Sequence, residues 1–211
     1  MRITKAIKKE MLERLEQYYK DTTTALTYST PFELMIAVIL SAQCTDARVN
    51  IITARMFPRY DTPEKILALG QSGLEEEIRD CGLFRSKAKN ILATCEKLCR
   101  EYGGQVPDNY DDLVQLPGVG RKTANVLLSQ LFGVPAIAVD THVFRVANRL
   151  KLAIGDTPLT VEQGLMRAIP REQWSDAHHW LIWHGRKVCK AAKPVCPTCP
   201  LNDLCPSCKA E

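Results

Sequence analysis

Hydrophobic residues recur along the chain at spacings of three and four positions, the period of an α-helix with one buried face. Residues 4–20 are one such segment, where apolar side chains form a stripe among lysines and glutamates. Residues 30–42 are apolar on nearly every side, so we expect this helix to be central and buried. Between residues 30 and 132 we find no convincing alternation of the kind that β-strands show. The pattern therefore predicts an all-α fold.

Side chains that can cap helices indicate where several of these helices begin. Thr30 is expected to cap one helix, with Pro31 in the first turn and Glu33 reaching back to the backbone of the cap. Ser86 is expected to cap another, after a loop over residues 82–85.

The segment LPGVGRKTAN, residues 116–125, combines a Pro/Gly turn with a basic helix start. Gly118 and Gly120 are free to adopt φ > 0, which lets the backbone fold back with its N–H groups turned outward, as an anion cradle requires. Upstream, Asp108 is expected to cap a short helix. Residues 108–132 are thus predicted to form a helix, a hairpin and a second helix.

Lys122 lies in the first turn of that second helix, and its position is compatible with two roles. The unpaired N–H groups, the positive end of the helix and the adjacent Arg121 all favour the neutral amine, the form that acts as a nucleophile. A solvated lysine at the same position would bind phosphate. Asp140 follows after a short apolar connection and is expected to begin a further helix, as an N-cap, a catalytic carboxylate or both.

Bulk composition narrows the class of protein only slightly. The 211 residues suffice for one large core or two small ones, and the net charge of +4 is a weak indication of a polyanionic partner. The longest apolar stretch is too short for a membrane helix, and the N-terminus is too charged for a secretory signal. We expect a monomer in the cytoplasm, associated with the nucleoid if the source is bacterial.

Five of the nine cysteines lie near the C-terminus, and without an export signal metal ligation explains them better than disulfides do. Two alternative sets of four cysteines could bind the metal. Cys189, Cys196, Cys199 and Cys205 have the spacing C-x6-C-x2-C-x5-C, and four thiolates suit a [4Fe-4S] cluster. The second set replaces Cys189 with Cys208 and forms two CxxC pairs, which suit tetrahedral zinc, although the loop between the pairs is short for a zinc site.

LPGVGRKTAN, together with the V-D-T-H of residues 139–142, resembles the helix-hairpin-helix region of the endonuclease III family of DNA glycosylases. The C-terminal cysteine spacing resembles the iron-sulfur loop of the same family, and the resemblance covers nearly the whole chain. It implies two helical lobes with a DNA-binding cleft between them, formed by residues 24–134 and by residues 1–23 with 135–211. It also favours a [4Fe-4S] cluster on the first ligand set, with Cys208 as a spare thiol.

The resemblance further implies roles for individual residues. Lys122 would attack the sugar of the damaged nucleotide, and Asp140 would assist departure of the base and support the cationic sugar. Gln43 would fill the space that the base leaves, and Leu83 would wedge into the opposite strand, whereas the residues alone are equally compatible with a surface turn and a core leucine. The other expected DNA contacts are Arg85, Gly118, Gly120, Arg121, His142, Lys190 and Lys193.

The function that follows from the resemblance is base excision repair of double-stranded DNA containing a damaged base or an abasic site. Monofunctional relatives carry another residue at the position of Lys122, so we expect a combined DNA glycosylase and AP lyase that removes oxidised pyrimidines such as thymine glycol. The alternatives are the same fold acting on pyrimidine dimers or mismatched thymine, and a noncatalytic DNA-binding iron-sulfur module.

Overall fold

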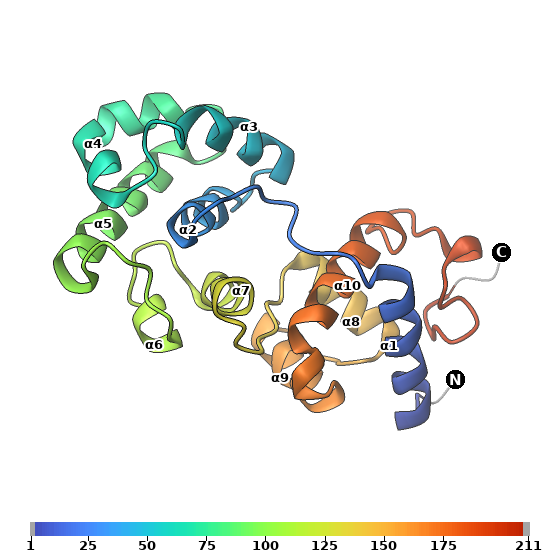
Figure 1. Cartoon of the computed structure of the whole chain (residues 1–211). Helices are drawn as coiled ribbons and strands as arrows, with labels where there is room; N and C mark the ends of the chain where they lie inside the picture. Colours follow the sequence, from blue (N-terminus) through green and yellow to red (C-terminus); the bar gives the residue numbers. More distant parts are fainter. Residues whose placement is uncertain (1–2, 209–211) are drawn as a thin grey trace. The chain divides into compact units, whose positions relative to one another are not determined.

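The computed structural model describes residues 3–208, and within that range every regular element is helical (Figure 1). The prediction of an all-α fold is confirmed. Ten α-helices and two short 3-10 helices follow one another in this range: α1 (Lys5–Tyr19), α2 (Pro31–Leu40), α3 (Asp46–Met56), α4 (Pro63–Ile78), α5 (Phe84–Tyr102), α6 (Tyr110–Leu113), α7 (Arg121–Phe132), α8 (Thr141–Leu150), α9 (Pro158–Ala168), η1 (Arg171–Gln173), α10 (Trp174–Lys187) and η2 (Cys196–Thr198).

The chain divides into two compact units. One, here called the hairpin unit, is the continuous segment Ala25–Phe132 and contains α2 to α7. The other, here called the cysteine unit, joins the N-terminal segment up to Thr24 with the chain from Gly133 onward, and so combines α1 with α8, α9 and α10.

Helix α2 lies at the centre of the hairpin unit, with every residue from Phe32 to Leu40 buried. The hydroxyl of Thr30 accepts a hydrogen bond from the N–H of Glu33, as the sequence predicts. The carboxylate of Glu33 accepts from the N–H of Ser29 at 2.6 Å, one residue before the expected partner. The helix start is thus fixed from both sides, which holds a helix with apolar residues on nearly every side in one register.

Helix α5 begins at Phe84, three residues before the start expected from a cap at Ser86. Its N-cap is Leu83, which adopts the left-handed conformation (φ 60°, ψ 30°) and has no side-chain cap. The carbonyl of Leu83 accepts the N–H of Lys87 at 3.0 Å, so the helical hydrogen bonds already begin there. The prediction from Ser86 is wrong because local capping propensity does not indicate a leucine in this conformation.

The core of the cysteine unit joins helices that are far apart in the sequence. Met11, Leu15 and Tyr19 of α1 are buried against α8, α9 and α10, and α1 runs beside α10 in Figure 1. The phenol of Tyr19 is hydrogen-bonded to Nδ1 of His184 in α10 at 3.2 Å. The N-terminal helix therefore belongs structurally to the C-terminal half of the chain.

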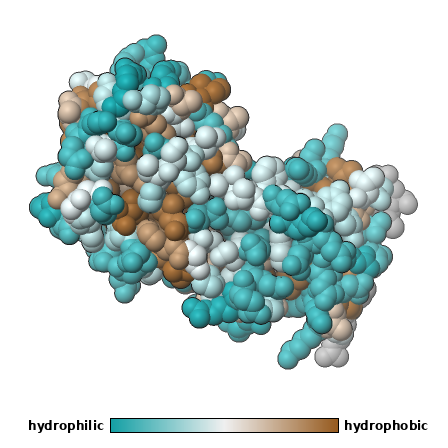
Figure 2. Space-filling view, in the orientation of Figure 1, coloured by the Kyte–Doolittle hydropathy of each residue, from teal (hydrophilic) through white to brown (hydrophobic). Residues whose placement is uncertain are grey.

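Hydrophilic residues cover most of the face drawn in Figure 2, and apolar residues show there in smaller patches. Among residues 3–208, no helix combines the length and apolar character needed to cross a bilayer.

Candidate nucleic-acid interface and metal centre

Helices α6 and α7 and the turn between them form the helix-hairpin-helix expected from the sequence. Helix α6 is capped by Asn109, whose side-chain oxygen accepts the N–H of Asp112 at 3.0 Å. The cap expected from the sequence, Asp108, lies one residue upstream, so that prediction is wrong. Asn109 is the last residue with extended backbone angles (φ −126°, ψ 155°) before the helix, which is where a capping side chain reaches the N–H three residues on.

The hairpin turn rests on α5. Gly118 has φ 79°, and a Cβ at this position would lie 3.1 Å from Cβ of Asn90. The buried hydroxyl of Thr94 donates to the carbonyl oxygen of Pro117 at 2.6 Å. At Gly120, in contrast, a Cβ would meet no atom within 4 Å, and φ is not positive. The turn therefore requires glycine at position 118, both for its backbone angle and for its contact with α5, but not at position 120 on either ground.

The first turn of α7 exposes two cations, Arg121 and Lys122. The guanidinium of Arg121 donates to the hydroxyl of Tyr110 at 3.2 Å and lies 5.6 Å from the centre of that ring. Backbone N–H groups of a first helical turn have no partner within the helix. Two exposed cations beside such N–H groups form a surface suited to a phosphate backbone.

Two exposed loops of the hairpin unit carry non-glycine residues in left-handed backbone conformations. Gln43 has φ 53° and Leu83 has φ 60°, and Leu83 is 58% exposed. Each such residue costs about 1–2 kcal/mol. The loops lie close together, because a Cβ on Gly82 would be 3.1 Å from the carbonyl oxygen of Gln43. The structure thus brings the two predicted gap-filling residues to adjacent loops, and strain of this kind is typical of functional sites.

Arg85 lies one residue beyond the start of α5 and is also exposed. Its guanidinium stacks 4.9 Å from the ring centre of Phe84, and Nε lies 4.0 Å from a carboxylate oxygen of Glu75. The Arg85 side chain is 79% exposed and its ion-pair distance is long, so it is loosely held and available to a ligand.

Asp140 is the N-cap of α8 in the cysteine unit, as the sequence predicts. Its Oδ1 accepts the N–H of Val143 at 2.8 Å. This bond orients the carboxylate and leaves Oδ2 for another partner. The side chain is half-buried and lies at the positive end of the α8 dipole, which suits an acidic residue.

His142 follows in the first turn of α8, where Arg145 fixes its ring. Nδ1 of His142 lies 3.2 Å from Nη2 of Arg145. Because a guanidinium only donates, Nδ1 is the acceptor and the proton of the neutral ring is on Nε2. Arg145 also donates to the backbone carbonyls of Gly185 and Cys189, at 2.9 and 3.1 Å. The ring of His142 is therefore set as a hydrogen-bond donor through Nε2, as a phosphate contact requires.

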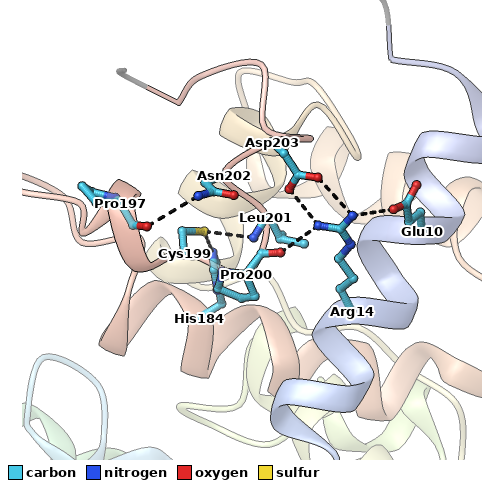
Figure 3. Close-up of polar contacts among 9 residues, drawn as sticks. All are labelled: Glu10, Arg14, His184, Pro197, Cys199, Pro200, Leu201, Asn202 and Asp203. Atoms are coloured by element: carbon cyan, nitrogen blue, oxygen red, sulfur yellow. Dashed lines mark hydrogen bonds and ion pairs between the residues drawn. The ribbon is translucent and has the colours of Figure 1, made fainter. Parts of the chain in front are cut away.

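The five C-terminal cysteines converge on one cavity of about 320 Å³ in the cysteine unit. Two of their sulfur atoms accept hydrogen bonds. Cys199 Sγ accepts from the backbone N–H of Leu201 at 3.4 Å and lies 3.7 Å from Nε2 of His184, as Figure 3 shows. Cys189 Sγ accepts from Arg149 at 3.4 Å. Lys190 and Lys193 are exposed on the segment between the first two cysteines.

Burial raises the pKa of the Cys199 thiol to about 11, and the neighbouring cysteines contribute in the same direction. The same causes act on Cys205 and Cys208. Within residues 3–208, no three His, Cys, Asp or Glu side chains stand at distances that would hold a metal ion. The arrangement is a pocket of crowded thiols, and a bound metal ion would favour their thiolate forms by compensating the negative charge.

A clamp from α1 holds the last cysteine-bearing loop in place (Figure 3). Arg14 makes a two-pronged ion pair with Asp203, at 2.7 and 3.1 Å, and also donates to the carbonyl oxygen of Pro200 at 3.2 Å. Glu10 accepts from the same guanidinium at 2.6 Å. The sequence alone gives no sign of this clamp, since its two sides are nearly the whole chain apart.

Comparison with known proteins agrees with these features. The HhH-GPD superfamily of base excision DNA repair proteins matches residues 36–171. Endonuclease III of Rickettsia conorii is 57% identical over 182 residues, which span 86% of this chain and 87% of that protein. Endonuclease III of Escherichia coli K12 is 49% identical over 203 residues, 96% of each chain. This chain belongs to the endonuclease III family. The resemblance inferred from the hairpin and the cysteine spacing is thereby confirmed.

The fold agrees with the family over its whole length. A solved structure of a trapped endonuclease III-DNA covalent intermediate, an estranged-adenine complex, superposes with a TM-score of 0.94 at 50% identity and covers 98% of this chain and 97% of that one. This endonuclease III family member carries a lysine at position 122 and an aspartate at position 140. Its supporting residues, Thr94, Arg14 and Arg145, carry no sequence signal of their own.

Proposed function

We propose that this endonuclease III family member is a bifunctional DNA glycosylase and AP lyase of base excision repair, acting on double-stranded DNA with an oxidised pyrimidine or an abasic site. The observation that carries the proposal is an exposed lysine in the first turn of α7, directly after the Pro/Gly hairpin. A lysine there is sterically free to reach a sugar, while the adjacent N–H groups hold the phosphates.

Lys122 is the proposed nucleophile. Its neutral Nζ attacks C1′ of the damaged nucleotide, the bond from C1′ to the base breaks, and the base leaves with the electron pair and takes up a proton. Opening of the sugar ring then gives a protonated Schiff base between Nζ and C1′. Loss of a proton from C2′ breaks the bond from C3′ to its phosphate oxygen, which cleaves the strand by β-elimination, and water releases the lysine.

Asp140 is proposed to support the positive charge that develops on the sugar as the base departs, as carboxylates do in glycoside hydrolysis. Its bond to the N–H of Val143 at 2.8 Å supports this role, since it fixes the carboxylate through one oxygen and leaves the second for the substrate. Capping and catalysis are thus compatible in the same side chain.

The remaining residues are proposed to grip and open the duplex. Gln43 and Leu83 fill the space of the extruded nucleotide and wedge into the opposite strand, with Arg85 near the estranged base. The backbone of the hairpin and several cations bind phosphates without reading sequence. These phosphate contacts are Gly118, Gly120, Arg121, His142, Lys190 and Lys193.

We further propose that Cys189, Cys196, Cys199 and Cys205 hold a [4Fe-4S] cluster. All four line one cavity, and the hydrogen bonds to Cys189 and Cys199 are of the kind that stabilise thiolate ligands. When bound, the cluster fixes the C-terminal loop and with it Lys190 and Lys193. Cys189→Ser should abolish the visible absorption of anaerobically purified protein and Cys208→Ser should leave it. A colourless unaltered protein that contains zinc would instead favour the second ligand set.

Borohydride trapping tests the proposed chemistry. Sodium borohydride reduces a Schiff base, so protein mixed with duplexes containing an abasic site or thymine glycol should form a covalent adduct on a denaturing gel. Lys122→Ala should form none while still binding DNA. Absence of an adduct with the unaltered protein would favour a noncatalytic DNA-binding module. Parallel duplexes with a G·T mismatch and a cyclobutane pyrimidine dimer test the lesion class, and excision of either in preference to thymine glycol would overturn it.

A further inference from the structure

The hairpin unit contains a buried lysine that the proposed chemistry does not use. Lys87 lies in the first turn of α5 and is only 5% exposed. A buried ammonium without hydrogen-bond partners would strongly destabilise the fold, so polar groups around it must compensate its charge. Its surroundings connect the two strained loops described above.

The ammonium of Lys87 donates to the carbonyl oxygen of Leu40 at 2.8 Å and to Sγ of Cys81 at 3.0 Å. The thiol of Cys81 in turn donates to the same Leu40 oxygen at 3.2 Å. Burial raises the pKa of Cys81, which keeps it as the thiol that this second bond needs. These three residues, here called the Lys87 cluster, are mutually hydrogen-bonded and buried.

Each member of the Lys87 cluster lies at the base of one of the two loops. Leu40 is the last residue of α2, and the chain leaves it directly into the loop that carries Gln43. Its carbonyl belongs to the last turn, which lacks partners within the helix and is at the negative end of the helix dipole, so a cation is favoured there. Cys81 lies two residues before Leu83.

The two loops also touch above this base. A Cβ on Gly82 would lie 3.1 Å from the carbonyl oxygen of Gln43, so the backbones pass each other closely and a side chain at position 82 would require a small shift of its neighbour. The loops are thus joined at two levels, by the Lys87 cluster below and by the Gly82 contact above. Left-handed conformations at Gln43 and Leu83 persist only where surrounding contacts hold them.

We propose that Lys87 is a positioning residue that locks the Gln43 and Leu83 loops into one rigid element, so that both side chains enter the duplex together. The proposal rests on the proposed function, since it presupposes that these side chains fill the gap left by an extruded nucleotide. Without Lys87, the loops would be joined less firmly, and the free-energy cost of ordering them would weaken binding to the lesion.

Binding by the full-length protein to two duplexes measures this effect. One duplex carries a tetrahydrofuran abasic analogue, the other is undamaged, and fluorescence anisotropy at one fixed salt concentration gives both dissociation constants. Lys87→Met should weaken binding to the abasic duplex about tenfold and leave the undamaged duplex within about twofold, the order expected for one lost hydrogen bond to a charged group. The matched control Lys89→Met, an exposed lysine on the same helix, should leave the ratio of the two constants unchanged.

A double-mutant cycle separates positioning from general support of the fold. If Lys87 acts through Leu83, Lys87→Met should add little to the loss caused by Leu83→Ala, because the wedge is already gone. If the losses multiply, or if Lys87→Met weakens both duplexes equally, the inference is wrong. Should Lys87→Met fail to fold, Gly82→Ala perturbs the upper contact from the surface and should lower the same ratio, whereas an unchanged ratio there overturns the proposal.

These outcomes are distinct from failure of the proposed function. If the unaltered protein shows no preference for the abasic duplex and no borohydride adduct, the proposed function fails. If it shows both and Lys87→Met retains the preference, only the positioning role of Lys87 fails.

Discussion

Substitutions at Asp140 can separate helix capping from chemistry, because the structure gives the carboxylate one bond to the backbone and leaves its second oxygen for a substrate. Oδ1 accepts the N–H of Val143 at 2.8 Å. Asparagine caps nearly as well as aspartate, so Asp140→Asn should lose only the interaction with the helix dipole, about 0.3–1 kcal/mol. Asp140→Ala removes the cap as well and should cost about 0.5–2 kcal/mol more.

Asp140→Asn and Asp140→Ala should differ in stability but have nearly the same activity. If the carboxylate supports the developing positive charge, both should slow base release in single-turnover reactions by about 10²–10⁴-fold, the usual range for a positioned acid-base group. Urea unfolding gives the stabilities, and alkaline cleavage of the product strand reports base release independently of the lyase step. Strand cleavage at preformed abasic sites should be affected less, since no base has to leave.

Thr157→Ala is the matched control. Thr157 caps α9 in the same unit, and its hydroxyl accepts the N–H of Thr160 at 3.2 Å. Its removal should cost about 1 kcal/mol and leave the rate of base release unchanged. Base release at the normal rate by Asp140→Asn would refute the catalytic role and leave Asp140 as a cap only. Equal slowing by Thr157→Ala would show that instability, not charge, is responsible.

Further outcomes follow from other parts of the structure. Gly118→Ala should weaken DNA binding and destabilise the protein by about 1–2 kcal/mol, because φ is 79° and the methyl would press on Asn90. Gly120→Ala should leave the stability unchanged, and urea unfolding compares the two variants. Burial lowers the pKa of His179 below its ordinary 6.5, despite the nearby Asp176. The stability from its neutral ring is therefore present above pH 6.5 and lost as pH falls through the lower folded-state pKa, and His179→Gln should flatten the acid side of a stability-pH curve. Arg14 clamps the C-terminal loop through Asp203, so Arg14→Met should speed proteolysis of that loop. The affinity of the unaltered protein for DNA should fall steeply as the salt concentration is raised.

Local sequence signals predict the helix starts that depend on a side chain close by. Thr30 and Asp140 cap their helices because each reaches an N–H three residues on, and such signals are contained in a few consecutive residues. The start of α5 cannot be predicted in this way, because the left-handed backbone of Leu83 is held by contacts with the Gln43 loop, which lies far away in the sequence. Propensity alone assigns that conformation to glycine or asparagine.

The residues that support the candidate site are not predictable in this way. The clamp between Arg14 and Asp203 spans 189 residues, and the bond from Thr94 to Pro117 depends on how α5 packs against the hairpin. Polar pairs this far apart in the sequence produce no periodic pattern from which they could be predicted. The family resemblance supplies candidate residues, while the three-dimensional contacts supply the reasons why those residues are held as they are.

The placement of α1 among the C-terminal helices has a consequence for biosynthesis. The hairpin unit is one uninterrupted stretch of chain and can fold while translation continues, but the first helix must wait, with its apolar face uncovered, until α8 to α10 have left the ribosome. The cysteine pocket closes only after that. Assembly of the proposed cluster would therefore be among the last events in making the protein, and a chain truncated before α8 would leave its N-terminal helix without these partners.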